Sequence, residues 1–130
     1  MQVKNLNHIN IQTTDMAGTI AFYERLLGLD ARTTRRDSAE QMWLHDPNGQ
    51  AVIHLNRFGS DNVYEREVVP GGLTGAIHHI AFECDGLNGA LVRLEEMGLR
   101  FERADTPQSR LVQLFVADPN NVLLELNFRV

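Results

Sequence analysis

The stretch Gln41-Met-Trp-Leu-His-Asp-Pro-Asn48 returns later in the chain as Gln113-Leu-Phe-Val-Ala-Asp-Pro-Asn120, at an offset of 72 residues. A second pair of segments, Ile53-His-Leu-Asn56 and Leu124-Glu-Leu-Asn127, is related by an offset of 71. Offsets that drift by one residue are what small loop insertions produce. Self-similarity at such a period indicates a structural unit that occurs more than once. We therefore expect two related halves.

The pattern of apolar residues predicts the same order of elements in both halves: a strand, a helix and three further strands. Asp15 offers a helix cap, and Gly28 and Gly98 are natural helix ends. In the first half we expect strands near 5–13, 29–36, 40–46 and 50–57 and a helix over 15–27. In the second half we expect strands near 77–84, 99–104, 110–117 and 121–128 and a helix over 86–97.

The two halves should form one α+β domain rather than two independent ones. A first βαβββ module covers about 1–57, a linker with Pro70-Gly-Gly72 covers about 58–75, and a second module covers about 76–130. Each half alone is too short to bury a good core. The chain of 130 residues as a whole is long enough.

Composition excludes several classes of protein. The net charge of −5 argues against a nucleic-acid partner, because phosphate binding needs a basic face. Cys84 is the single cysteine, so no intrachain disulfide can form. No apolar run is long enough for a membrane span, and the first residues lack the apolar region of a signal peptide. We expect a cytoplasmic protein with a small-molecule substrate.

Four polar residues stand on the face of their strands that lies opposite the apolar face. Side chains alternate across a strand, so His54 points away from Ile53 and Leu55. By the same parity His8, His79 and Glu125 point away from the apolar residues beside them. If the helices cover one side of a curved sheet, these four side chains converge on its other side.

Three imidazoles and a carboxylate suit one divalent ion, which could be Ni, Zn, Co, Fe or Mn. A single histidine on a strand is more often a hydrogen-bonded or exposed residue than a ligand. Here, however, His8 pairs with His79 and His54 pairs with Glu125 at the same offset of 71. We expect His45, beside a turn, to be solvated, and His78 to point toward the helix layer.

Several segments of the chain resemble the vicinal-oxygen-chelate superfamily, which includes glyoxalase I, methylmalonyl-CoA epimerase, extradiol dioxygenases and fosfomycin-resistance thiol transferases. The resemblance covers essentially the whole chain, and its pattern is most similar to microbial glyoxalase I. It is carried by His8, Phe22-Tyr-Glu-Arg-Leu-Leu-Gly-Leu29, His79-Ile-Ala-Phe82 and Phe115-Val-Ala-Asp-Pro-Asn-Asn-Val-Leu-Leu-Glu-Leu126. It implies two βαβββ modules in a cupped, mostly antiparallel sheet, with the helices outside and the metal on the concave face.

The resemblance also implies roles for individual residues. His8, His79 and Glu125 match the three ligand positions that most metal-using members share. His54 stands at a fourth position, where glyoxalase I has Glu or Gln and the epimerase has Gln. Phe115 occupies the place of a catalytic tyrosine in the extradiol dioxygenases, which argues against ring cleavage of the usual kind. The resemblance further implies a homodimer, with His8 and His54 of one chain meeting His79 and Glu125 of the other.

Three functions remain open. The first is a metal-dependent lyase or isomerase that acts through an enediolate or enolate on a small oxygenated carbonyl compound, with Glu125 as ligand and possible base. The second is a non-haem Fe(II) dioxygenase, for which His8, His79 and Glu125 would form the triad. The third is a non-catalytic binding or resistance protein. Candidate pocket walls, with ordinary sheet packing as the equal alternative, are Gln41, Trp43, Gln113 and Phe115.

Overall fold

The computed structural model describes residues 1–33, 39–60 and 66–130. The chain divides into two compact units, Met1–Pro70 and Gly71–Val130. Both units have the predicted order of elements, a strand, a helix and three strands, which confirms the α+β fold of two βαβββ modules. Residues 34–36 of the strand expected at 29–36 lie outside the described part of the chain.

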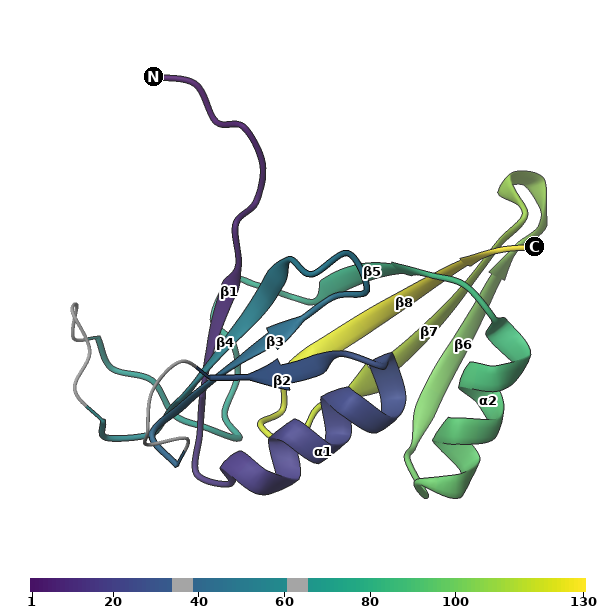
Figure 1. Ribbon diagram of the computed structural model, residues 1–130. Coiled ribbons are helices and arrows are strands. Elements are labelled where there is room, and N and C mark those ends of the chain that lie inside the picture. Colours follow the sequence, from purple (N-terminus) through teal and green to yellow (C-terminus); the bar gives the residue numbers. More distant parts are fainter. Residues whose placement is uncertain (34–38, 61–65) are drawn as a thin grey trace. The chain divides into compact units, whose positions relative to one another are not determined.

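Within its described residues, the first unit contains one helix and a four-stranded sheet in the order β1-β4-β3-β2 (Figure 1). Strands β1 and β4 run parallel, and the other two pairings are antiparallel. This mixture follows from the connections, because a helix links β1 to the rest of the sheet while β3 and β4 are joined by a tight turn. The elements are β1 (Ile9–Thr13), α1 (Met16–Leu27), β2 (Asp30–Arg32), β3 (Gln41–His45) and β4 (Ala51–Arg57).

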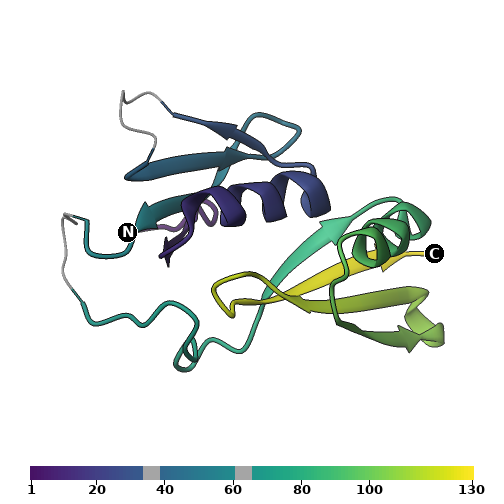
Figure 2. The ribbon, with the colours of Figure 1, turned by 90° about the horizontal axis from the view of Figure 1, so that it is seen from below.

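The second unit repeats this topology in the order β5-β8-β7-β6. Strands β5 and β8 are parallel, and the remaining pairs are antiparallel. Figure 2 shows each helix lying across the sheet of its own unit. The elements are β5 (Ile80–Cys84), α2 (Leu87–Glu96), β6 (Phe101–Thr106), the short 3-10 helix η1 (Pro107–Ser109), β7 (Leu111–Ala117) and β8 (Leu123–Arg129).

The repeated Asp-Pro-Asn motifs form the same turn in both units. The backbone N–H of Gly49 donates to the carbonyl of Asp46 at 2.9 Å, and that of Asn121 donates to the carbonyl of Asp118 at 3.0 Å. Gly49 and Asn121 both have positive φ, at 81° and 63°. Glycine and asparagine tolerate this left-handed conformation better than other residues, which explains why they end the two motifs.

Helix α1 has both predicted ends. The Asp15 carboxylate accepts a hydrogen bond from the N–H of Gly18 at 2.9 Å, and Gly28 closes the helix with φ at 67°. The buried face consists of Thr19, Phe22, Tyr23 and Leu26. Their spacing of three and four residues brings these side chains onto one face of the helix.

The predicted alternation of faces is confirmed on the last strand of each unit. Ile53 and Leu55 on β4 are fully buried, as are Leu124 on β8 and Leu114 on β7 beside it. These side chains form the apolar side of each sheet. The polar residues at the intervening positions lie on the other side, where the candidate site is found.

Two predicted strands begin later than expected. The strand expected from residue 5 begins at Ile9, and the strand expected from residue 77 begins at Ile80. His8 and His79 thus lie one residue ahead of β1 and β5, where backbone pairing with the neighbouring parallel strand has not yet begun. No helix within the described ranges is long and apolar enough to span a membrane.

Candidate metal site and adjoining pocket

The second unit brings two of the predicted ligands into contact. Nε2 of His79, just before β5, lies 3.1 Å from Oε2 of Glu125 on β8. Parallel pairing of Ala81 with Glu125 aligns the two strands and brings the start of β5 beside the carboxylate. The Glu125 side chain is only 11% exposed, whereas the His79 side chain is 36% exposed. The pair therefore has a shielded carboxylate and an accessible imidazole.

The two oxygens of Glu125 have different surroundings. Oε1 accepts hydrogen bonds from the side-chain amides of Gln113 and Asn127, each at 2.8 Å. The Gln113 amide also donates to Oδ1 of Asn127 at 3.0 Å. Charged acceptors make the stronger hydrogen bonds, so Oε1 is fixed to the sheet while Oε2 is directed toward His79.

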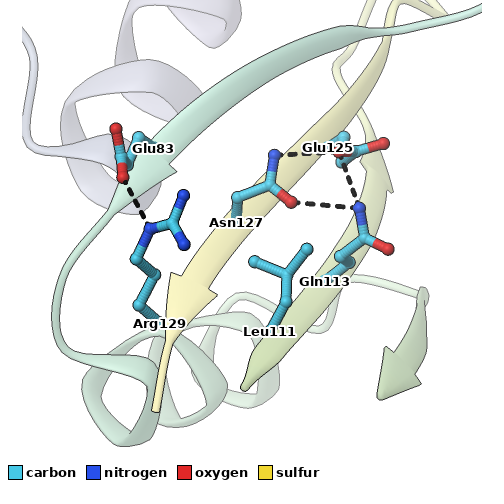
Figure 3. Close-up of a pocket in the computed structure, with 6 residues that line it drawn as sticks. All are labelled: Glu83, Leu111, Gln113, Glu125, Asn127 and Arg129. Atoms are coloured by element: carbon cyan, nitrogen blue, oxygen red, sulfur yellow. Dashed lines mark hydrogen bonds and ion pairs between the residues drawn. The ribbon is translucent and has the colours of Figure 1, made fainter. Parts of the chain in front are cut away.

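A pocket of about 280 Å³ adjoins Glu125 on this face of the second sheet. Figure 3 shows Glu125 and Asn127 projecting from β8 toward Gln113 on β7. Two further lining residues form an ion pair, in which Nε of Arg129 donates to Oε1 of Glu83 at 3.2 Å. The pocket is mainly polar and combines two carboxylates, two amides and one guanidinium, since its lining residues are Glu83, Leu111, Gln113, Glu125, Asn127 and Arg129.

The first unit places His54 between two amide side chains. Nε2 of His54 lies 3.2 Å from Oε1 of Gln41, and Nδ1 lies 3.2 Å from Nδ2 of Asn10. An amide oxygen accepts and an amide nitrogen donates, so this arrangement fits a neutral imidazole that carries its proton on Nε2. Both ring nitrogens of His54 are thus engaged with protein groups.

Two other rings, those of Trp43 and His8, lie beside His54. The Trp43 ring stacks on His54, with ring centroids 3.8 Å apart and planes inclined by 3°. The ring of His8 meets Trp43 edge-on at 4.9 Å and lies 6.0 Å from the ring of His54. Nδ1 of His8 lies 2.6 Å from Oδ1 of Asn7. If Nδ1 donates in that bond, Nε2 of His8 keeps its lone pair, as a metal ligand requires.

The donor atoms of the second unit fit a divalent ion. Two cis ligands at about 2.0–2.1 Å from one ion, with angles of about 90–110°, lie about 2.9–3.3 Å apart. The separation of 3.1 Å between His79 Nε2 and Glu125 Oε2 is in this range, and it is also the length of a direct N–H···O hydrogen bond. Across residues 1–33, 39–60 and 66–130, no three His, Cys, Asp or Glu side chains form a set that could hold a metal ion. Each unit carries two of the four predicted ligands.

The other predicted residues have mixed outcomes. Phe115 meets His79 edge-on, with ring centroids 6.1 Å apart, but it does not line the pocket beside Gln113. The expectation for His45 was wrong: the residue is half-buried, and its Nδ1 is buried with no hydrogen-bond partner among the described residues. The expectation for His78 was also wrong, since it is exposed and its Nδ1 lies 2.9 Å from Nδ1 of His79.

Sequence reasoning missed five residues at the site. Asn10 and Asn127 bond to the predicted ligands, and Leu111, Arg129 and Glu83 line the pocket. A signal for Asn127 was available, because it shares the parity of Glu125 and the repeat pairs it with Asn56. No pattern indicated the other pocket residues, since side-chain direction alone does not show where a sheet face is hollow.

Residues 5–126 match the family model of the Glyoxalase/Bleomycin resistance protein/Dioxygenase superfamily. The chain belongs to this superfamily. Its members are largely enzymes that bind small molecules, typically use a divalent metal and often dimerise. The expected membership of the vicinal-oxygen-chelate superfamily is therefore confirmed.

Two curated relatives match the chain over most of its length. The chain is 33% identical to the protein YaeR of Escherichia coli over 128 residues, which cover 95% of each chain. It is 25% identical over 130 residues to Glyoxylase I 4 of Arabidopsis thaliana, where the match covers 97% of this chain and 71% of that protein.

Solved structures share the fold. An integron cassette protein of Vibrio cholerae has a TM-score of 0.75 and 21% identity, with coverage of 100% of this chain and 98% of that one. The fosfomycin resistance protein FosX of Listeria monocytogenes has a TM-score of 0.71 and 18% identity, with coverage of 99% and 96%. At these identities the likeness shows the shared fold.

Proposed function

We propose that the protein is a metal-dependent lyase or isomerase of glyoxalase type. Its substrate is a small oxygenated carbonyl compound, which reacts through an enediolate or enolate. The observation that carries this proposal is the contact between His79 and Glu125 Oε2 at 3.1 Å. The other carboxylate oxygen, Oε1, is held by the side-chain amides of Gln113 and Asn127.

One divalent ion supplies, when bound, the positive charge that makes loss of a proton next to a carbonyl feasible near neutral pH. We assign its ligands to His8, His54, His79 and Glu125. In the homodimer that we propose, His8 and His54 come from one chain, and His79 and Glu125 come from the other. Frequent dimerisation in the superfamily supports this arrangement.

Glu125 is the residue to which we assign proton transfer. Oε1 already accepts two amide N–H groups, so Oε2 is the atom that accepts the proton, and it can do so only while it is released from the ion. Burial to 8% exposure removes most of the water that would otherwise solvate the carboxylate. A base must lie within hydrogen-bond reach of the proton that it removes, and the pocket directly beside Glu125 provides that position for a substrate.

The size and lining of the pocket support a small polar substrate. Its volume of about 280 Å³ is just below the range of pockets that hold drug-sized ligands. Both N–H groups of Gln113 bond within the sheet, so its side-chain oxygen is the group that it offers a substrate. Asn127 and the guanidinium of Arg129 offer hydrogen-bond donors, and Leu111 offers one apolar contact. This lining suits a compact oxygenated metabolite better than a large apolar one.

The decisive experiment for this function is hydrogen exchange at the carbon next to a carbonyl. The Co²⁺-loaded protein is incubated in D₂O with α-ketoaldehyde–thiol adducts and acyl-CoA epimers, and NMR detects deuterium in recovered substrate or product. Exchange that disappears in Glu125→Gln supports the proposal. Exchange that is absent from every compound, or that persists fully in Glu125→Gln, contradicts it.

One observation favours the dioxygenase as a second candidate. Both ring nitrogens of His54 bond to side-chain amides, so the ligand set could reduce to His8, His79 and Glu125, the two-His, one-carboxylate triad of non-haem iron enzymes. Oxygen uptake by the Fe²⁺-loaded protein in the presence of candidate substrates would support this alternative. A binding protein without turnover would show neither oxygen uptake nor deuterium exchange.

A further inference from the structure

Gln41 and Gln113 occupy equivalent places in the two units. Each is on the third strand, β3 or β7, and they are related by the repeat offset of 72. In the sheet, Gln41 pairs with Asn56 and Gln113 pairs with Asn127. The register therefore sets each glutamine diagonally beside the proposed ligand of the last strand.

Each glutamine contacts that ligand, but with opposite ends of its amide. The Gln41 oxygen lies 3.2 Å from Nε2 of His54, whereas the Gln113 nitrogen donates to Oε1 of Glu125 at 2.8 Å. A primary amide has both an acceptor and a donor. The same residue type can therefore hold an imidazole N–H in one unit and a carboxylate oxygen in the other.

The contact in the second unit selects one carboxylate oxygen. Gln113 bonds to Glu125 Oε1 and to Asn127 Oδ1, and Asn127 bonds to the same Oε1. These three bonds close a ring of side chains on the sheet (Figure 3). A carboxylate held in this way presents only Oε2, so it acts as a ligand through one oxygen rather than two.

The contact in the first unit selects one tautomer. An acceptor at Nε2 and the Asn10 amide donor at Nδ1 both favour the imidazole that carries its proton on Nε2. Stacking on Trp43 fixes the plane of the ring. His54 can bind an ion through Nε2 only after the bond to Gln41 is released.

We propose that Gln41 and Gln113 are a repeated pair of positioning residues. Gln113 fixes Glu125 so that Oε2 alone is presented, and Gln41 holds His54 in the tautomer that has its proton on Nε2. The part that concerns the ion rests on the proposed function. Gln113 bonds to Oε1, the oxygen that is not assigned to the ion, and removal of such a group behind a metal ligand typically costs about 10- to 100-fold in affinity.

The experiment compares Gln113→Met and Gln41→Met with Gln12→Met as the matched control. Methionine keeps the length of glutamine but makes no comparable hydrogen bond. Gln12 is half-buried on β1 and bonds to none of the proposed ligands. The measurements are the Co²⁺ dissociation constant by calorimetry, the visible spectrum of bound Co²⁺, the melting temperature, and NMR of the metal-free protein.

For Gln113→Met we expect Co²⁺ to bind about 10- to 100-fold more weakly. The Co²⁺ spectrum should change, and the ¹³Cδ signal of Glu125 in the metal-free protein should shift. The melting temperature should stay close to that of Gln12→Met, because the proposed role of Gln113 is to orient the Glu125 carboxylate and not to stabilise the fold. Unchanged affinity, spectrum and ¹³Cδ signal relative to Gln12→Met would overturn the role of Gln113.

For Gln41→Met we expect the ¹⁵N ring signals of His54 to change from one tautomer, protonated on Nε2, to a mixture. Gln12→Met should keep the single tautomer. A His54 tautomer that is the same in all variants would overturn the role of Gln41. If the wild-type protein binds no Co²⁺, the proposed function fails, while the metal-free NMR signals still decide both positioning roles.

Discussion

The Nε2 atom of His79 lies 3.1 Å from Oε2 of Glu125, across the parallel pairing of β5 and β8. The contact joins an accessible imidazole to a carboxylate whose other oxygen is held by two amides.

Glu125→Gln should reduce both metal binding and turnover. The substitution keeps the size of the side chain and one ligand oxygen but removes the negative charge, so an ion is held less tightly. Proton abstraction should fall further, by about 10²- to 10⁴-fold, because an amide cannot act as a base. Metal content and turnover of the purified variant measure the two effects. Full activity with bound metal would show that the carboxylate is neither base nor essential ligand.

His54→Gln is the informative comparison. Gln at this position resembles the epimerase branch, and an amide can replace both hydrogen bonds that His54 makes to Gln41 and Asn10. We expect this variant to keep its metal and a measurable part of its activity. Loss of metal equal to that of Glu125→Gln would mean that His54 is as necessary a ligand as the carboxylate.

Asp118→Ala should destabilise the protein more than Asp46→Ala. The carboxylate of Asp118 is buried and accepts hydrogen bonds from the backbone N–H groups of Asn120 and Val122, each at 2.8 Å. Leaving such buried donors without a partner costs about 1–3 kcal/mol each. The equivalent bonds of Asp46, at 2.9 Å, are exposed, so water can replace them.

Urea unfolding of the two alanine variants measures the difference in the free energy of unfolding. Asp118→Asn is the control, because its side-chain oxygen can still accept both bonds. We expect it to be much closer to wild type than Asp118→Ala. An equal decrease in the free energy of unfolding for Asp46→Ala and Asp118→Ala would show that burial of the turn does not determine the cost of losing these hydrogen bonds.

Much of the fold could be predicted from the sequence because both halves carry the same turn motif at the same place. The Asp-Pro-Asn motifs at Asp46 and Asp118 predict the two hairpins, and strict alternation predicts the buried faces of β4 and β8. The strand starts at Ile9 and Ile80 could not be predicted from alternation. Parallel pairing requires a partner strand alongside, and the length of that partner is not visible in the local pattern.

The candidate site could be predicted only in part. Parity placed Glu125 and His54 on the polar faces, but it does not say which neighbours bond to them. The contacts of Asn10 and Asn127 depend on strand register, which pairs Asn10 with His54 and Gln113 with Asn127. For His45 the expectation itself was wrong. Its position beside a turn suggested a solvated side chain, whereas its Nδ1 is buried.

Cys84 should react slowly with thiol reagents at neutral pH. Burial raises the pKa of its thiol above the usual value, Asp85 and Glu83 raise it further, and the backbone N–H of Asn127 lowers it in part. The thiolate is the reactive form, so the rate should begin to rise at a higher pH than for a free thiol. Alkylation rates from pH 7 to 10, with and without urea, measure this. A native rate at neutral pH equal to the rate in urea would contradict the expectation.

Trp43 should report on metal binding. It is the only tryptophan of the chain, and its ring stacks on His54 and lies edge-on to His8. A paramagnetic ion such as Co²⁺ held by either imidazole should quench the fluorescence of the adjacent indole. Titration should give saturable quenching in wild type and weaker quenching in Glu125→Gln. Saturable quenching that is identical in both proteins would mean that Glu125 is not a ligand of the ion that quenches Trp43.

The central claim is that His79 and Glu125 help to hold one divalent ion. The most direct test is the metal content of protein purified without a His-tag or added metal, followed by Co²⁺ titration of the wild type and of His79→Ala. We predict one ion per chain in the wild type and a large loss of affinity in His79→Ala. Failure of the wild type to bind stoichiometric Co²⁺, or equally tight binding by His79→Ala, would contradict the account.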